Sequence, residues 1–223
     1  MDLLQLIIEL RHSEPLRLFR PYEELYRSLT EKELSKKEIP LPGFQLNISE
    51  KRMQVVVDPR HTAIVLGDVP NIGYCVDNVV GVFRKISDLV KLPPLVRLGA
   101  KSYWIQKSEV SFSELVSTYK QIIYKSSSIV EDSIDVGASF ILKDGKYAAN
   151  VAFGPMEVSQ LKIMFAFEPP KLPEVVSFLD IDYYLVMEQT ELTEKMLREF
   201  VNAGLNYASE QSRRLVSILA KEE

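Results

Sequence analysis

Apolar and polar residues alternate along much of the chain, which is the pattern expected of strands that bury one face of a sheet. The alternation is clearest in MQVVVDP, TAIVLGD, LVRLGAKSYWIQ, KYAANVAFG and VVSFLDIDYYLVME. Strands are also expected in MDLLQLIIEL, IPLPGFQLNIS, DVGASFILK and SQLKIMFAFE. Between two of these strands stands Asp144-Gly145, where glycine supplies the positive φ that a tight hairpin turn requires. The pattern therefore predicts antiparallel neighbours.

Four further segments carry apolar residues at helical spacing or helix-start signals. Ser111 and Glu114 form a capping box that begins one of these helices, and Pro21 fits the first position of another. The predicted helices lie within residues 13–37, 73–92, 111–124 and from about residue 190 onward.

The order of these elements predicts an α+β fold, because hairpin signals outnumber any strand-helix-strand rhythm. We expect a predominantly antiparallel sheet of about eight strands, packed on one face by about four helices. The 223 residues fit a single domain. A polar, serine-rich link at residues 125–132 would be the boundary if the chain forms two lobes, 1–125 and 133–223.

Composition narrows the class of protein. With 46% hydrophobic and 26% charged residues, the chain is an ordinary globular protein. Its net charge of −4 disfavours non-specific binding to nucleic acids and to anionic membranes. No apolar run approaches the roughly 20 residues that cross a bilayer, so we expect no membrane-spanning segment. The only cysteine is Cys75, which excludes an intramolecular disulfide and favours a reducing, cytoplasmic location.

One candidate site lies in the turn between the first two alternating segments. A carboxylate, a guanidinium and an imidazole are adjacent there, on Asp58, Arg60 and His61, and such a trio could bind phosphate or move protons. We favour a structural role, because Asp and Pro are common turn formers. Neither His12 nor His61 has a second His or Cys at metal-ligand spacing, so a zinc site is not supported.

A second candidate is a pair of carboxylates. Asp180 and Asp182 are two residues apart on a predicted strand, so both point to one face and could hold a divalent cation. The alternating residues Leu179, Ile181 and Tyr183 belong to an apolar face on the same strand. We therefore favour the aspartates as the solvent side of that strand, since two carboxylates without a third ligand make a poor metal site.

The third candidate combines charge with an aromatic ring. Arg97, Lys101 and Tyr103 share one face of a predicted strand and could form a strip for single-stranded nucleic acid. Two cations are few against the acidity of the chain, so a solvated sheet face is favoured. Glycines are scattered and form no nucleotide-binding loop, and we expect no cofactor.

The segment around these cations also carries a resemblance. Leu92-Pro93-Pro94-Leu95-Val96-Arg97-Leu98-Gly99, followed by Lys101 and Tyr103, resembles the P-L-x-R-x-G-x-R-Y signature of a sporadically distributed bacterial family. Lys101 stands where that family has its second arginine. The resemblance extends over nearly the whole chain. It implies an α+β fold and no established catalytic residues, because the family is uncharacterised.

These observations favour a non-enzymatic binding or assembly protein that acts through protein-protein contacts, as a scaffold, a chaperone-like factor or a defence accessory. A homodimer is the default, because closed two-fold oligomers are the commonest way to cover exposed edges. Enzymatic activity stays open and is not favoured. The alternatives are a metal-assisted hydrolase using Asp180 and Asp182, and a nucleic-acid-binding module using Arg97, Lys101 and Tyr103.

Overall fold

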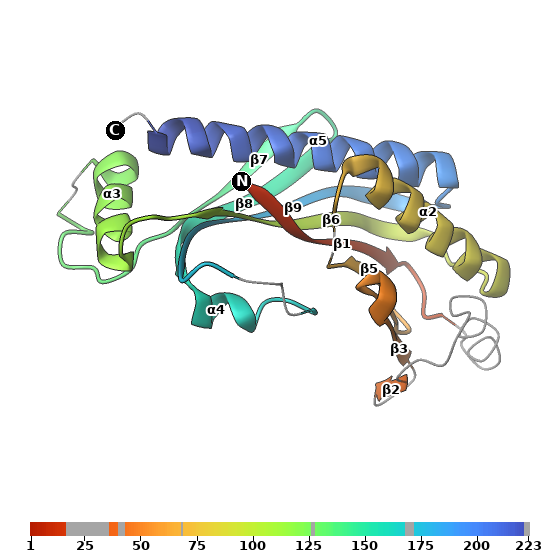
Figure 1. Cartoon of the computed structure of the whole chain (residues 1–223). Helices are drawn as coiled ribbons and strands as arrows, with labels where there is room; N and C mark the ends of the chain where they lie inside the picture. Colours follow the sequence, from red (N-terminus) through yellow and green to blue (C-terminus); the bar gives the residue numbers. More distant parts are fainter. Residues whose placement is uncertain (17–35, 40–42, 68, 126–127, 168–171, 221–223) are drawn as a thin grey trace.

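A computed structural model describes residues 1–16, 36–39, 43–67, 69–125, 128–167 and 172–220. Within them, nine strands form one antiparallel sheet and four α-helices pack around it, so the predicted α+β class is confirmed (Figure 1). The strand order is β2-β3-β4-β5-β1-β6-β9-β8-β7.

The elements have the following bounds. The strands are β1 (Asp2–His12), β2 (Lys36–Ile39), β3 (Gly43–Ile48), β4 (Met53–Val57), β5 (His61–Leu66), β6 (Leu95–Lys107), β7 (Ala138–Asp144), β8 (Tyr147–Glu157) and β9 (Val175–Thr190). The helices are α2 (Ile72–Leu89), α3 (Phe112–Tyr124), α4 (Val158–Lys162) and α5 (Glu194–Leu219), with one turn of 3-10 helix, η1 (Ser49–Lys51). The predicted helix that begins at Pro21 lies outside the described residues.

The sheet draws its strands from both halves of the chain. The first strand, β1, lies between β5 and β6, and β9 lies between β6 and β8. Strand β6 therefore joins the N-terminal strands to the C-terminal ones. Residues 1–125 and 133–223, which would be the two lobes if the chain were divided at residues 125–132, contribute to one continuous sheet.

Helices cover the two faces of the sheet unequally. Helices α2 and α5 lie side by side on one face, α3 stands at one end, and α4 lies against the opposite face (Figure 1). We call the face opposite α2 and α5 the open face. The expectation that all helices pack on one face was wrong, because α4 packs on the open face.

The prediction of a strand in SQLKIMFAFE was wrong: the chain forms α4 in the first half, and residues 163–167 form turns and bends. The helix begins because Glu157 and Gln160 cap each other, with the Glu157 N–H donating to Gln160 Oε1 at 2.9 Å. Leu161 is then buried against Tyr103 and Phe178 of the sheet. The cap and the burial of Leu161 together favour a helix here, although the sequence has the pattern of a strand.

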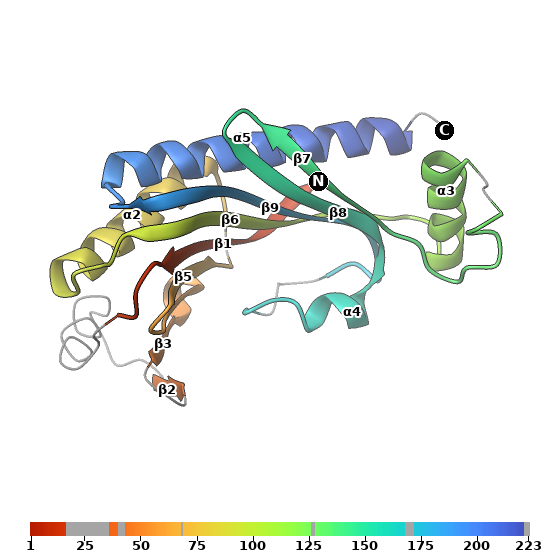
Figure 2. The ribbon, with the colours of Figure 1, turned by 180° about the vertical axis from the view of Figure 1, so that it is seen from behind.

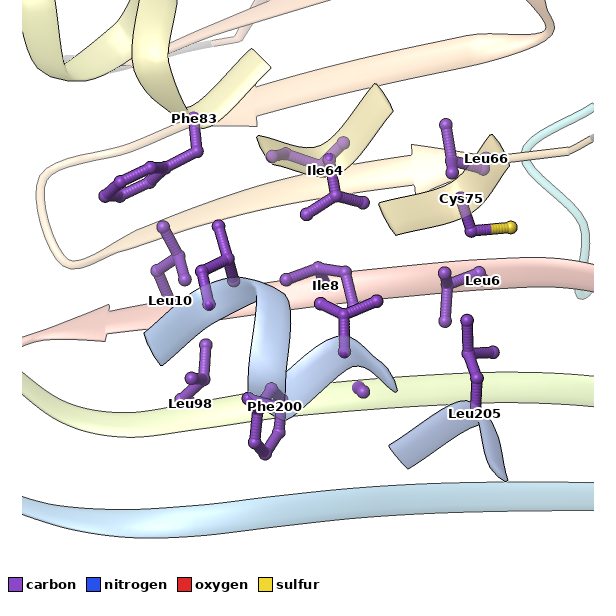
Figure 3. Packing of buried hydrophobic residues seen from close by; sticks show 14 of the residues in the cluster. Leu6, Ile8, Leu10, Ile64, Leu66, Cys75, Phe83, Leu98, Phe200 and Leu205 are labelled. Carbon is purple, nitrogen blue, oxygen red and sulfur yellow. The ribbon is translucent and has the colours of Figure 1, made fainter. Parts of the chain in front are cut away.

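The main core fills the space between the sheet and its two long helices. Figure 3 shows alternate residues of β1 between β5 and β6, with side chains of α2 and α5 packed against them. The labelled members are Leu6, Ile8, Leu10, Ile64, Leu66, Cys75, Phe83, Leu98, Phe200 and Leu205. Every second residue of a strand enters this layer, as the alternation predicted.

Helix α5 lies close to the sheet at Gly204. A Cβ atom there would lie 3.0 Å from Tyr183 Cδ1 and 3.3 Å from Ala100 Cβ, so the missing side chain lets the helix sit close to β6 and β9. The buried stripe of α5 consists of Leu197, Phe200, Val201, Gly204, Leu205, Ala208, Ser212 and Leu215. Met196, Ala203 and Tyr207 flank this stripe and are partly buried.

Several local predictions are confirmed. Ser111 and Glu114 form the capping box of α3, and Gly145 has a φ of 60° in the β7–β8 turn.

Among the described residues, no helix combines the length and apolarity needed to cross a membrane.

The core packing can be tested at Phe200. Truncation by Phe200→Ala should lower the free energy of unfolding by about 3–5 kcal/mol, because it removes a buried ring and leaves a cavity under α5. Urea denaturation followed by circular dichroism measures the change. Ile218→Ala, at an exposed position of the same helix, is the matched control and should change it by less than about 1 kcal/mol. Equal losses in both variants would contradict this description of the core.

Candidate interaction site on the open sheet face and its edge

Arg97 bridges three strands on the open face. Its guanidinium donates to Glu9 Oε2 of β1 at 3.0 Å and to both carboxylate oxygens of Asp182 on β9 at 2.7 and 2.8 Å. It also lies over the ring of Tyr184, 4.7 Å from the centroid. Only 15% of the Arg97 side chain is exposed. This cation is held on all sides by β1, β6 and β9.

Gly99 makes that geometry possible. A Cβ atom at this position would lie 3.0 Å from Arg97 Nη1, so the guanidinium occupies the space that a side chain would take. Gly99 pairs with Glu9 on one side and with Tyr184 on the other. The spacing of Arg97 and Gly99 in the segment that carries the family resemblance therefore has a physical reason.

A second ion pair on the open face joins Lys101 of β6 to Asp180 of β9. Lys101 Nζ is 3.1 Å from Asp180 Oδ2, and the other oxygen, Oδ1, is buried without a hydrogen-bond partner among the described residues. Burial raises the pKa of the Asp180 carboxyl, although the charge of Lys101 opposes this effect. Burial alone would lower the pKa of Lys101, but the charges of Asp180 and Tyr103 overcome it and the pKa is raised.

Together these residues form what we call the ion-pair ladder. Its members are Glu9, Arg11, Arg97, Lys101, Asp180 and Asp182. Three cations face three carboxylates, so the ladder carries no net charge. Arg11 completes it by donating to Glu9 at 2.9 Å.

The ladder joins two predicted candidate sites that the sequence left apart. Asp182 and Asp180, the metal-site candidates, are the ion-pair partners of Arg97 and Lys101, the nucleic-acid candidates. Each carboxylate thus holds a cation of the protein, and each cation is neutralised. Among the described residues, no group of three or more His, Cys, Asp or Glu side chains could hold a metal ion.

Tyr103 is buried, whereas the sequence placed it on a solvated face. The segment that includes α4 covers this end of the open face, and Tyr103 packs there against Phe165 and Phe178. Gln5 anchors the cover, because its Oε1 accepts the Ala166 N–H at 2.9 Å. The ring of Tyr103 is thus unavailable for stacking on a base.

Asp58, Arg60 and His61 form the β4–β5 turn. Asp58 Oδ1 accepts the backbone N–H groups of Arg60 and His61 at 2.7 and 2.8 Å, and Asp58 Oδ2 pairs with His61 Nδ1. These bonds fit the structural role that the sequence favoured. His61 pairs with Arg11 on β1, whereas Asp182 pairs with Lys101 on β6. The structure does not bring this turn together with the two aspartates.

His12 is buried nearby at the end of β1. Its Nε2 is 3.0 Å from Thr62 Oγ1, and Nδ1 has no hydrogen-bond partner among the described residues. Burial lowers the pKa of His12 from 6.5 to about 4, because the charged imidazolium is poorly solvated there. The histidine is therefore neutral in the folded protein at physiological pH.

A groove of about 460 Å³ lies between the start of β7 and α4. Small residues form part of its lining, including Ser139, Ala152 and Gly154 from neighbouring strands. Two carboxylates also line it, those of Asp135 and Asp180. The groove therefore combines an apolar lining with acidic side chains, next to the edge of the sheet.

Strand β7 forms that edge and exposes three consecutive apolar residues. The exposed fractions are 49% for Phe140, 74% for Ile141 and 37% for Leu142. In the described part of the chain no strand pairs with the outer side of β7, and Figure 2 shows it as the outermost strand of the sheet. The sequence predicted this strand but not its place at the edge, because the strand order is a property of the whole fold.

The backbone of β7 presents unpaired groups at every second residue. The two-residue turn at Gly145 makes Asp144 and Tyr147 the closing hydrogen-bonded pair. Alternate residues from Asp144 backward therefore bond to β8. The residues between them, Ser139, Ile141 and Lys143, direct their N–H and C=O groups away from the sheet. We call this outward side, with its apolar residues, the β7 edge.

Comparisons with known proteins add little to this geometry. No family model matches the chain, and neither does any curated protein. One solved structure, Methanococcus jannaschii TBP, aligns with 98% of this chain and 97% of that chain, at 7% sequence identity and a TM-score of 0.33. A TM-score of this size establishes no shared fold or function.

The ion-pair ladder predicts that replacing Arg97, its central cation, destabilises the protein. Arg97→Leu should lower the free energy of unfolding by about 1–3 kcal/mol, because it leaves Asp182 half-buried without its cation and Glu9 with Arg11 alone. The matched control is Arg84→Leu, which removes a bidentate pair with Glu194 that is well exposed. That change should lower the free energy of unfolding less than Arg97→Leu does, because water and salt screen an exposed ion pair. Urea titrations of both variants measure the difference, and a larger loss for Arg84 would contradict the role given to Arg97.

His12 predicts a pH dependence. Its pKa is lower in the folded than in the unfolded state, so its contribution is fully present above 6.5 and is lost as the pH falls toward 4. As the pH falls over this range, the free energy of unfolding of the wild type should therefore drop by on the order of 3 kcal/mol more than that of His12→Gln. Denaturant titrations from pH 7.5 to 4 measure both slopes. Parallel slopes would show that His12 does not titrate in this way.

Proposed function

We propose that this protein is a non-enzymatic binding or assembly protein that acts through protein-protein contacts at the β7 edge. The observation that supports the proposal is the run Phe140-Ile141-Leu142 on an edge strand whose outward backbone groups have no partner in the described part of the chain. An edge of this kind is a template for pairing with another strand. Binding there would satisfy the backbone and bury apolar side chains at the same time.

The two edges of the sheet differ. Strand β2, at the opposite end, is four residues long and has the sequence KKEI. Short edge strands and lysine-rich sequences discourage pairing. Strand β7 has seven residues, with no proline, and its charged residues, Lys143 and Asp144, lie only at its end beside the turn. The contrast supports β7 as the edge that is used.

The proposal covers several finer roles that share this mode of action, namely a scaffold, a chaperone-like factor or a defence accessory. It keeps the cytoplasmic location expected from Cys75, which is buried. It also keeps the resemblance to the uncharacterised bacterial family, in whose signature Arg97 and Gly99 stand. Neither hydrolysis nor nucleic-acid binding is favoured by the ion-pair ladder, whose charges are matched internally.

The edge can be tested by affinity capture in the native host. A tagged protein is expressed beside an untagged copy, and every retained protein is quantified. Ile141→Lys should reduce the specifically retained protein about tenfold or more, because it places a charge at the centre of the apolar contact. The control is Ile163→Lys, at an exposed apolar residue outside β7.

Thermal denaturation first confirms that both variants are folded. Retention that is equal for wild type, Ile141→Lys and Ile163→Lys would contradict the β7 edge as the binding surface. Retention of neither the untagged copy nor any host protein by the wild type would contradict the proposed function itself.

A further inference from the structure

We infer that the strand that occupies the β7 edge is β7 of a second copy of this chain, paired antiparallel about a two-fold axis at Ile141. This inference rests on the proposed function and adds the identity of the partner and the register of the contact. It would join two sheets into one, with α2 and α5 of both copies on the same face, because the axis runs perpendicular to the sheet.

The backbone is self-complementary in this register. Ser139, Ile141 and Lys143 direct their hydrogen-bonding groups outward, and they are spaced evenly about Ile141. Antiparallel pairing places Ile141 opposite its own counterpart and Ser139 opposite Lys143 of the second copy. Each outward residue then faces another outward residue, so all of them exchange hydrogen bonds. Centring the axis on Phe140 or Leu142 leaves one outward residue of each strand without a facing partner.

Apolar side chains also match across the axis. Ile141 lies on the open face, because it pairs with Asn150, which lies 3.5 Å from Asp182. It would contact Ile141 of the second copy there. Phe140 and Leu142 lie on the opposite face, and each would face the other residue type across the axis, an aromatic-aliphatic pair that stabilises antiparallel sheets.

Charge complementarity favours the same register. Lys143 of one copy lies beside Ser139 of the other, at the groove that Asp135 also lines. Asp135 and Lys143 make no ion pair within the described part of the chain, and both are exposed. At each end of the contact, the dimer would thus bring Lys143 of one copy toward Asp135 of the other, a carboxylate that accepts the Val136 N–H but has no ion-pair partner among the described residues. A register centred on Lys143 would instead oppose two like charges.

The single native cysteine allows a direct test of the register. Cys75 is buried, so Ile141→Cys introduces one accessible thiol. In the proposed register the two Ile141 Cα atoms are about 5.5 Å apart, within the range of roughly 4.4–6.8 Å that a disulfide spans. Mild oxidation should therefore link Ile141→Cys into covalent dimers. Ile163→Cys, which is 87% exposed as isoleucine, should stay monomeric on the same gel.

Sedimentation of the purified full chain provides the second test. The fraction of wild-type dimer should rise as the protein concentration is raised to about 100 µM. A weak dimer is expected because a contact of one strand pair belongs to the small class of interfaces. Ile141→Lys should be monomeric throughout. Lys143→Glu and Asp135→Lys should each weaken the dimer roughly two- to thirty-fold, and the double variant should restore it.

Three results would overturn the inference: a wild type that stays monomeric, a dimer that persists in Ile141→Lys, or cross-linking of Ile141→Cys that is no faster than that of Ile163→Cys. These results are distinguishable from failure of the proposed function. If the wild type is monomeric but retains a host protein in an Ile141-dependent manner, the edge binds a different partner, and only the inference fails.

Discussion

An open antiparallel sheet leaves two faces and two edges, and each of these must be covered, neutralised or paired. Helices α2 and α5 cover one face with the main core. The open face is neutralised along β1, β6 and β9 by the ion-pair ladder and covered at one end by α4. Of the two edges, β2 is short and β7 is long and apolar. Within the described part of the chain, the β7 edge is therefore neither covered nor paired.

The ladder pairs the charged residues of the open face with one another. Arg97 donates hydrogen bonds to Glu9 and Asp182, and its guanidinium occupies space that a side chain at Gly99 would take. Side chains that could hold a metal or a phosphate group are instead used to hold strands together. The ladder thus links β1, β6 and β9 across the open face, and the recognition that we propose is at the β7 edge.

The fold could be predicted from the sequence wherever one local rule dominated. The apolar face of β9, the capping box at Ser111 and the glycine turn at Gly145 each depend on neighbours in the chain, and each is confirmed. Contacts between distant strands could not be predicted. The face of Arg97 followed from the alternation, but its partner Asp182 is set by the register of β6 and β9. For the same reason the burial of Tyr103 under α4 and the edge position of β7 had no signal in the sequence.

The most direct measurement of the central claim is hydrogen exchange of individual β7 amides at several protein concentrations. In dilute protein, the outward amides of Ser139, Ile141 and Lys143 should exchange quickly, while those of Phe140 and Leu142, which bond to β8, stay protected. In concentrated protein, the outward amides should become protected as well. Outward amides that stay protected at every dilution, or that never become protected, would contradict the account of β7 as an edge open to a second copy.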